Sequence, residues 1–256
     1  MAKIVVFDSG LGSLSIIKAI QKTIKSDIIY FADQKNFPYG KKSTKELNKI
    51  ITRTIYKLKK EFEPDLIIMG SNTPSLLLKK LFHNNHTLIG VFPPLAEACK
   101  KTKTKSIAIL ATSSIIQSRV LKHYIKKNLD KDIQITKIDA SKLVNLVESG
   151  KFLYEKIYCA KQITSLLGDK FASTNIDVAT LSSTHLPFLL PLLTKSFPKI
   201  KFLDPAVIVA QEIKKNKLFF PSNKNSLTIF SSGDVDIFQK HLDKLRIKNK
   251  VKKINF

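Results

Sequence analysis

Residues 4–9 read Ile-Val-Val-Phe-Asp-Ser, a run of four apolar residues followed at once by a carboxylate and a hydroxyl. Residues 107–112 read Ile-Ala-Ile-Leu-Ala-Thr and repeat the pattern in the second half of the chain. Short apolar runs that end in small polar residues are typical of buried strands that lead into a helix. The two stretches predict that each half of the chain contains an equivalent strand.

A second pair of segments supports this internal repeat. Residues 71–78 read Ser-Asn-Thr-Pro-Ser-Leu-Leu-Leu, and residues 183–190 read Ser-Thr-His-Leu-Pro-Phe-Leu-Leu. Each follows a predicted strand, at residues 66–69 and 178–181, and each leads into a predicted helix. Two repeated pairs in the same order indicate two equivalent lobes.

Strands and helices alternate along the whole chain, which favours parallel sheets with helices on their faces. Amphipathic spacing predicts helices over residues 14–24, 47–58 and 234–245, the second opened by Ser43 or Thr44 and the last capped by Asp234. The predicted fold class is α/β, with two similar parallel-sheet lobes of pseudo-two-fold symmetry and a ligand cleft between them. Further strands are predicted at residues 28–31, 88–91, 133–138, 201–203 and 227–230.

The composition is strongly basic, with a formal net charge of +24. Only three of the 44 basic residues are arginines, and the lysines are spread along the whole chain. This spread favours a general compositional bias over a nucleic-acid face, since no zinc-finger, RNP-type or KH-type signature accompanies it. Attraction of small anions is a further interpretation of the charge. We therefore expect a partner other than nucleic acid.

No apolar run approaches the roughly 18 residues that a membrane-spanning helix needs, because Pro187 and Pro191 interrupt the longest. The first eight residues carry too few apolar side chains for a signal peptide. The two cysteines, Cys99 and Cys159, have neither metal-ligand spacing nor the pattern of a disulfide framework. We expect a cytoplasmic protein with no membrane partner and no bound metal.

Four polar clusters follow predicted strands and are the candidate ligand-binding residues. In parallel sheets ligands bind beyond the carboxyl ends of the strands, and a helix N-terminus there favours an anion. Taken singly, each cluster is equally typical of a turn, a helix cap, a packed tyrosine or a structural histidine. Together they suit a ligand with carboxylates and an amine, whose ammonium Asp8 could meet. The clusters are Asp8-Ser9-Gly10, Pro38-Tyr39-Gly40 with Asp33 upstream, Ser71-Asn72-Thr73 and Ser183-Thr184-His185.

With their neighbours, these residues resemble the glutamate racemases of the aspartate/glutamate racemase superfamily. The opening motif of that family, Phe-Asp-Ser-Gly-x-Gly-Gly, appears at residues 7–13 with Ser13 in the last position. Its Pro-Tyr-Gly-x-Lys-Ser is intact at residues 38–43. Further matches bring the resemblance to essentially the whole chain; they lie at residues 143–150, 203–205 and 231–234.

The chain departs from the family at the two positions that carry its chemistry. Members racemise glutamate without a cofactor, as one cysteine thiolate removes the α-proton and an opposite thiol donates one. The family motif Ala-Cys-Asn-Thr-Ala-Ser appears at residues 70–75 as Gly-Ser-Asn-Thr-Pro-Ser. The second motif, Gly-Cys-Thr-His-Tyr-Pro, appears at residues 182–187 as Ser-Ser-Thr-His-Leu-Pro. Both cysteine positions are therefore serine, at Ser71 and Ser183.

The resemblance implies interconversion of L- and D-glutamate by two-base proton transfer at Cα, with no cofactor. Aspartate is the lesser candidate substrate, and a homodimer is left open. It also implies one lobe of residues 1–95 with 205–256 and another of residues 96–204. The implied catalytic residues are Ser71, Ser183, Asp8, His185 and Glu148, and the implied substrate-binding residues are Asp8, Ser9, Tyr39, Gly40, Asn72, Thr73, Thr112, Thr184 and His185.

The serines leave three interpretations open. A hydroxyl has a pKa about 5 units above that of a thiol, which corresponds to about 7 kcal/mol and to a rate factor on the order of 10⁵. The serines were introduced into a racemase to trap its substrate, or racemisation was lost naturally in a silent amino-acid or dicarboxylate binder, or the same cleft performs another reaction. Gly70 and Pro74 also depart from the family motif, which favours natural divergence.

Overall fold

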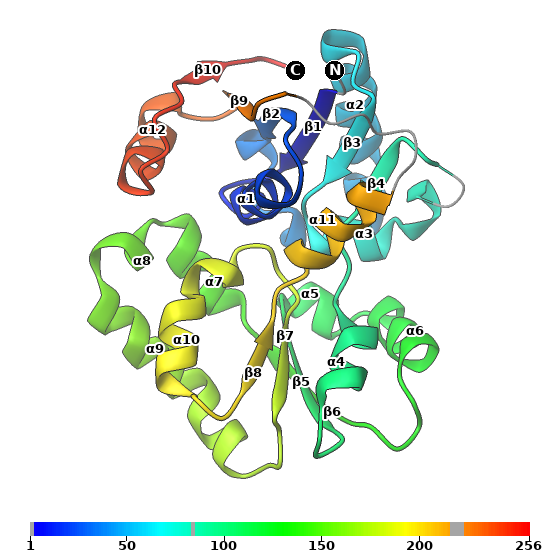
Figure 1. Ribbon diagram of the computed structural model, residues 1–256, viewed down its shortest axis with the longest axis vertical. Coiled ribbons are helices and arrows are strands. Elements are labelled where there is room, and N and C mark those ends of the chain that lie inside the picture. Colours follow the sequence, from blue (N-terminus) through cyan, green and yellow to red (C-terminus); the bar gives the residue numbers. More distant parts are fainter. Residues whose placement is uncertain (1–2, 83–84, 216–222) are drawn as a thin grey trace. The chain divides into compact units, whose positions relative to one another are not determined.

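The computed structural model describes residues 3–82, 85–215 and 223–256 (Figure 1). The chain forms two compact units. The first ends at Val91 and resumes at Ala206, and the second spans Phe92–Pro205. Each unit is built on one sheet in which all neighbouring strands run parallel. The predicted α/β class with two parallel sheets is confirmed.

The first unit carries a six-stranded sheet in the order β10-β9-β2-β1-β3-β4. The central strand β1 pairs with β2 on one side and β3 on the other. The strands are β1 Lys3–Asp8, β2 Asp27–Ala32, β3 Leu66–Met69, β4 Leu88–Gly90, β9 Ser226–Ser231 and β10 Val251–Lys253.

The second unit carries a four-stranded sheet in the order β6-β5-β7-β8. This order reproduces β2-β1-β3-β4 of the first unit, with β5 in the place of β1 and β7 in the place of β3. The repeat predicted from the sequence therefore corresponds to equivalent strands of two similar sheets. The strands are β5 Ser106–Ala111, β6 Gln134–Asp139, β7 Val178–Leu181 and β8 Lys201–Leu203.

The helices connect successive parallel strands, and two of the predicted caps are present. The Ser43 hydroxyl accepts a hydrogen bond from the Glu46 amide, and the Asp234 carboxylate accepts bonds from two amides of the last helix. The first unit contains α1 Leu14–Thr23, α2 Thr44–Phe62, α3 Asn72–Leu77, α11 Ala206–Lys215 and α12 Val235–Lys244, with the 3-10 turns η1 Gln34–Asn36, η2 Tyr39–Lys41 and η3 Lys79–Phe82. The second contains α4 Leu95–Lys101, α5 Ser113–Ile116, α6 Arg119–Asn128, α7 Ser141–Glu148, α8 Lys151–Tyr154, α9 Lys156–Ala172, η4 Leu186–Leu189 and α10 Leu190–Ser196.

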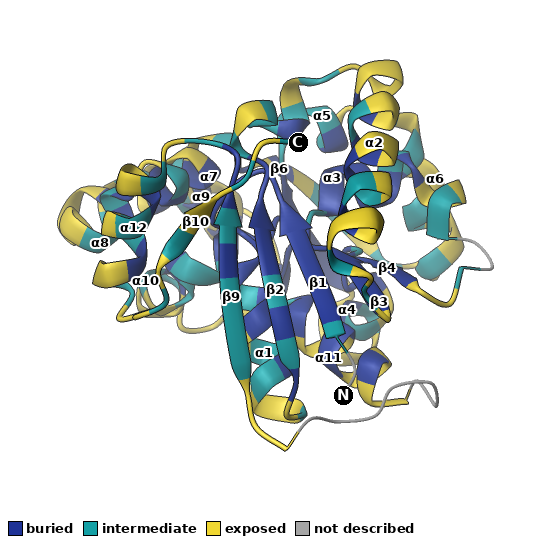
Figure 2. Ribbon diagram, turned by 90° about the horizontal axis from the view of Figure 1, so that it is seen from above, coloured by how far each residue is buried: buried dark blue, intermediate teal, exposed yellow. Residues whose placement is uncertain are grey.

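Apolar packing fixes the strands of the first unit. Alternate residues of a strand point to opposite faces, and Val5 and Phe7 of β1 pack with Leu47 and Ile51 of α2. The strands β1 and β2 are almost entirely buried (Figure 2). In the same unit α1 packs against α11 (Figure 1). Such burial contributes about 1.5–3 kcal/mol for each large side chain, so the carboxyl ends of the strands are firmly held.

In the second unit, Ile107 of β5 and Val178 of β7 form a buried cluster with Ala98 of α4. The sheet is thus anchored in the same way at its centre. Among the described residues, no helix combines the length and the apolar character needed to cross a membrane.

Candidate functional site

The first half of the candidate site lies at the carboxyl ends of β1 and β3. Phe7 pairs with Met69, and one step further the Gly70 amide donates to the Phe7 carbonyl at 2.8 Å. The ladder ends there, and the next residue, Ser71, is the N-cap of α3. On the neighbouring strand β1, the last residue is Asp8. Its side chain is fully buried.

The second half is built in the same way at the carboxyl ends of β5 and β7. Leu110 pairs with Leu181, and the Ser182 amide donates to the Leu110 carbonyl at 2.8 Å. Ser183 follows directly and is buried. The same hydrogen bond therefore closes both ladders, and each of the two serines is the first residue beyond it.

The turn that carries Ser71 is tied to the segment after β4. The Ser75 hydroxyl donates to the Ser71 carbonyl at 2.7 Å and accepts from the Val91 amide at 2.9 Å. The Asn72 side-chain amide donates to the Val91 carbonyl at 3.1 Å. By contrast, the Ser71 hydroxyl makes no capping hydrogen bond to its own helix. The backbone of the turn is held by its neighbours, and the Ser71 hydroxyl is not used for capping.

Asn72 carries an unused acceptor. Its side-chain oxygen is buried and has no hydrogen-bond partner, although the residue is only 2% exposed. The bond from the side-chain nitrogen to the Val91 carbonyl fixes which end of the amide is the oxygen. A buried acceptor without a partner costs about 1–3 kcal/mol. A ligand ammonium or hydroxyl is a donor that would remove this cost.

Asp33, at the end of β2, anchors Tyr39 of the predicted site. The Tyr39 hydroxyl donates to the Asp33 carboxylate at 2.9 Å, which also accepts bonds from Asn36 and Ser232. Burial raises the pKa of Asp33 above its ordinary value, although these hydrogen bonds act in the opposite direction. Burial, and then the nearby charges of Asp33 and Asp8, hold the pKa of Tyr39 well above its usual range. Tyr39 is therefore a neutral hydrogen-bond donor at physiological pH.

In the second unit, a histidine and a glutamate form a buried pair. Nε2 of His185 lies 2.9 Å from Oε2 of Glu148, and both side chains are largely buried. Glu148 is the last residue of α7, and His185 directly precedes η4, which packs against α7. A carboxylate on one ring nitrogen fixes the orientation and tautomer of the imidazole. This arrangement suits a histidine that accepts or donates a proton.

The predicted residues are divided between the two units. In the repeat, Asp8 of the first unit corresponds to Ala111 of the second, and Thr73 corresponds to His185. The repeat therefore gives the two units different titratable residues, Asp8 in the first and His185 in the second. The first set is Asp8, Ser9, Tyr39, Gly40, Ser71, Asn72 and Thr73, and the second is Thr112, Glu148, Ser183, Thr184 and His185.

Four supporting contacts were not predicted from the sequence. Ser75 links the turn of Ser71 to Val91, and Asn36 and Ser232 complete the surroundings of Asp33. A further contact joins Ser13 to Gly70, whose carbonyl accepts a bond from the Ser13 hydroxyl at 2.9 Å. The signal for this last contact was present, because residues 13 and 70 both depart from the family motif.

No cluster of three or more His, Cys, Asp or Glu side chains that could hold a metal ion occurs among residues 3–82, 85–215 and 223–256.

The curated relatives that the chain matches over most of its length are glutamate racemases. The chain is 33% identical over 217 residues to the glutamate racemase of Buchnera aphidicola subsp. Schizaphis graminum, covering 82% of this chain and 83% of that protein. It is 30% identical over 240 residues to the glutamate racemase of Clostridium botulinum strain Alaska E43, covering 89% and 90%. The crystal structure of a glutamate racemase isoform from Bacillus anthracis matches with a TM-score of 0.88 at 24% identity, over 100% of this chain and 98% of that one. No family model matches the chain.

Proposed function

Because the chain belongs to the glutamate racemase family, we propose that it interconverts L- and D-glutamate by removing and returning the proton at Cα. The observation that carries this proposal is the equivalence of Ser71 and Ser183. Each is the first residue beyond a ladder closed by the same hydrogen bond, at the end of β3 in one unit and of β7 in the other. Inversion at a carbon needs one proton acceptor and one proton donor, and the repeated fold supplies one position for each.

In the first unit, Ser71 takes one acid/base position and Asp8 assists it. Asp8 is fully buried, and its Oδ1 accepts a hydrogen bond from the Ser9 amide at 2.7 Å. Its charge suits the ammonium of an amino acid. The buried oxygen of Asn72 offers that ammonium an additional acceptor. Ser9, Tyr39, Gly40 and Thr73 complete the substrate-binding set of this unit.

In the second unit, Ser183 takes the other acid/base position and His185 assists it. The bond to Glu148 stabilises the imidazolium that forms if His185 accepts a proton. Thr112 and Thr184 offer hydroxyl groups near Ser183, since Thr112 and Ser183 each lie two residues beyond the paired residues Leu110 and Leu181. Hydroxyl donors suit the carboxylates of glutamate.

Serine makes this reaction slower than cysteine would. The higher pKa of a hydroxyl raises the barrier by about 7 kcal/mol if nothing compensates. A neighbouring base reduces the barrier because it accepts the hydroxyl proton as the hydroxyl acts on Cα. We therefore expect the turnover rate to be well below that of a thiol-based racemase. Asp8 would act as the base for Ser71, and His185, paired with Glu148, would act as the base for Ser183.

The alternative of a silent amino-acid binder is not favoured, since the relatives reported above are glutamate racemases and the match covers most of their length. Glutamate is the proposed partner, and the net charge of +24 favours an anionic substrate. We propose the same chemistry without a cofactor, because the assisting groups belong to the chain itself.

The test is incorporation of solvent deuterium at Cα of L-glutamate and D-glutamate, followed separately by proton NMR. The proposal predicts exchange for both enantiomers above a heat-denatured control, and slower exchange in the Ser71→Ala and Ser183→Ala variants. Binding of glutamate by calorimetry with no exchange of either enantiomer would instead support the silent binder.

A further inference from the structure

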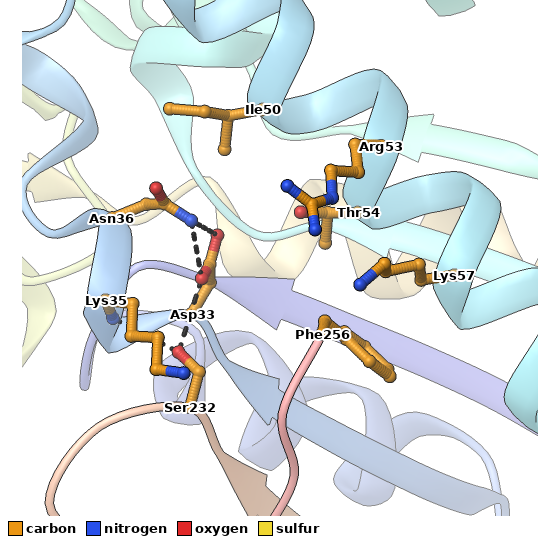
Figure 3. A pocket seen from close by; sticks show the side chains of 9 residues that line it. All are labelled: Asp33, Lys35, Asn36, Ile50, Arg53, Thr54, Lys57, Ser232 and Phe256. Carbon is orange, nitrogen blue, oxygen red and sulfur yellow. Dashed lines mark hydrogen bonds between the residues drawn. The ribbon is translucent and has the colours of Figure 1, made fainter.

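A small cavity lies beside Asp33, and all of its lining residues belong to the first unit. Its volume is about 90 Å³. One water occupies about 30 Å³ of liquid, so the cavity has room for about three waters or for one tetrahedral oxyanion. Its walls come from η1, from α2, from Ser232 directly after β9 and from Phe256 after β10 (Figure 3).

The charged groups around this cavity are mainly cationic. Lys35 and Asn36 come from η1, Arg53 and Lys57 come from successive turns of α2, and Figure 3 shows the ends of the two α2 side chains directed towards the space beside Asp33. Within the described part of the chain, no ion pair involves Lys35, Arg53 or Lys57. Their charge is not neutralised by a carboxylate at ion-pair distance.

Asp33 is the one acidic side chain among the lining residues, and neutral donors already occupy its carboxylate. Asn36 donates to both of its oxygens at 2.9 Å, Tyr39 donates to Oδ2 and Ser232 donates to Oδ1. Among the lining side chains, three are cationic and one is a carboxylate, a formal excess of +2, and the main-chain carboxylate of Phe256 also belongs to a lining residue. A phosphate group carries about −1.5 to −2 charges at neutral pH, which matches this excess.

Arg53 adds specificity to the charge. It is one of only three arginines in a chain whose other 41 basic residues are lysines, so a general lysine bias does not account for it. The planar guanidinium offers paired donors that fit an oxyanion in a bidentate manner. The Phe256 ring, whose centre lies 5.6 Å from the Lys57 ammonium, closes the cavity on one side.

We propose that this cavity is a binding site for a phosphate group, held by Arg53, Lys57 and Lys35, and distinct from the glutamate site. The side-chain amide of Asn36 supplies a neutral wall of the site. The Asp33 carboxylate accepts bonds both from Asn36 of this wall and from the Tyr39 hydroxyl. The proposal does not depend on racemase activity.

The experiment titrates inorganic phosphate into the full-length protein at constant ionic strength, with chloride as the balancing ion. Binding is followed by isothermal calorimetry and by the NMR signal of the Asn36 side-chain amide. The variant Arg53→Gln with Lys57→Gln removes two charges from the cavity. The matched control, Arg119→Gln with Lys122→Gln, removes two charges from the exposed surface of α6.

In the wild type we expect one saturable site and a shift of the Asn36 signal with the same midpoint. The affinity for phosphate should be at least tenfold weaker in the cavity variant. In the control variant it should change by less than twofold. Circular dichroism shows whether both variants keep their fold, and if the double variant does not, Arg53→Lys takes its place with the same tenfold criterion. Equal weakening in both variants, or a response that does not saturate, would show attraction to the general positive surface and would overturn the proposal.

Discussion

The hydroxyl of Ser13 lies in the space that a methyl group on residue 70 would need. A Cβ built on Gly70 would come within 1.8 Å of the Ser13 Oγ and 2.7 Å of its Cβ. The family motifs have glycine at the position of Ser13 and alanine at the position of Gly70. In this chain the larger side chain is therefore at residue 13 and residue 70 has none. Such a paired exchange accompanies natural divergence, since replacing only the two catalytic cysteines would not require it.

The pair can be tested by a double-mutant cycle. Gly70→Ala alone should destabilise the protein by about 1–3 kcal/mol through overpacking, and Ser13→Gly alone by about 1 kcal/mol through the lost hydrogen bond. The double variant, which restores the family pattern, should be more stable than the sum of the single changes predicts. Denaturant unfolding measures each free energy, and additivity within about 0.5 kcal/mol would show that the two residues are independent.

Asp33 gives a prediction for pH. Burial raises the pKa of its carboxyl above 3.8 in the folded state. The folded protein therefore binds this proton more tightly than the unfolded chain, and the resulting contribution to stability is fully present below pH 3.8 and lost as pH rises through the folded pKa. Asp33→Asn is neutral throughout, so its unfolding free energy should improve relative to the wild type as pH rises through this window. A difference that is flat or of opposite sign between pH 3.5 and 6 would contradict the assignment.

At the scale of elements, Ser75 connects α3 to the segment that follows β4. Its hydroxyl accepts from the Val91 amide and donates to the Ser71 carbonyl, so one buried side chain sets the position of the turn that carries Ser71. Ser75→Ala should cost about 1–3 kcal/mol, because the buried Val91 amide loses its partner. Thr23→Ala, at an exposed site on α1, serves as the control and should change stability by less than about 0.5 kcal/mol. A similar loss in both variants would deny Ser75 this role.

The contact between α7 and η4 places Glu148 against His185 and yields an asymmetric prediction. Glu148→Gln keeps an acceptor for the ring but removes the charge, a loss of about 1.4 kcal/mol and hence of about tenfold in rate. The rate of deuterium exchange should fall about tenfold for the enantiomer whose α-proton is removed on the Ser183 side. Exchange of the other enantiomer, started on the Ser71 side, should change less. Equal losses for both enantiomers, or none, would remove the pair from its proposed role.

Most strands could be predicted because apolar runs are local signals, whereas most helices of the second unit were not predicted. The nine predicted strands correspond to β1–β9 within one or two residues at either end, and Asp234 caps α12 as expected. The strand β10 was missed, since Val251–Lys253 has three residues, two of them lysines. The bond from Ser13 to Gly70 and that from Ser232 to Asp33 join residues far apart in sequence, and no local pattern encodes such contacts.

For the whole molecule, the central feature is a repeated half-site. Each unit has a serine directly beyond its central ladder, and the proposed assisting groups are Asp8 in the first unit and His185 in the second. The sequence repeat predicted this pairing because the two serine segments follow equivalent strands. The proposed assisting groups differ because the two repeats differ at these positions. Asp8 corresponds to Ala111, and Thr73 corresponds to His185.

The direct test is the racemisation rate of the variant with Ser71→Cys and Ser183→Cys, measured by polarimetry from each enantiomer of glutamate. A thiol lowers the pKa of both acid/base groups by about 5 units, and positioning by the unchanged residues supplies several kcal/mol more. We predict racemisation in both directions, faster than in the wild type by several orders of magnitude, with each single cysteine variant far slower than the double one. A folded double variant that binds glutamate yet racemises it no faster than the wild type would contradict the assignment of Ser71 and Ser183 as the two acid/base positions.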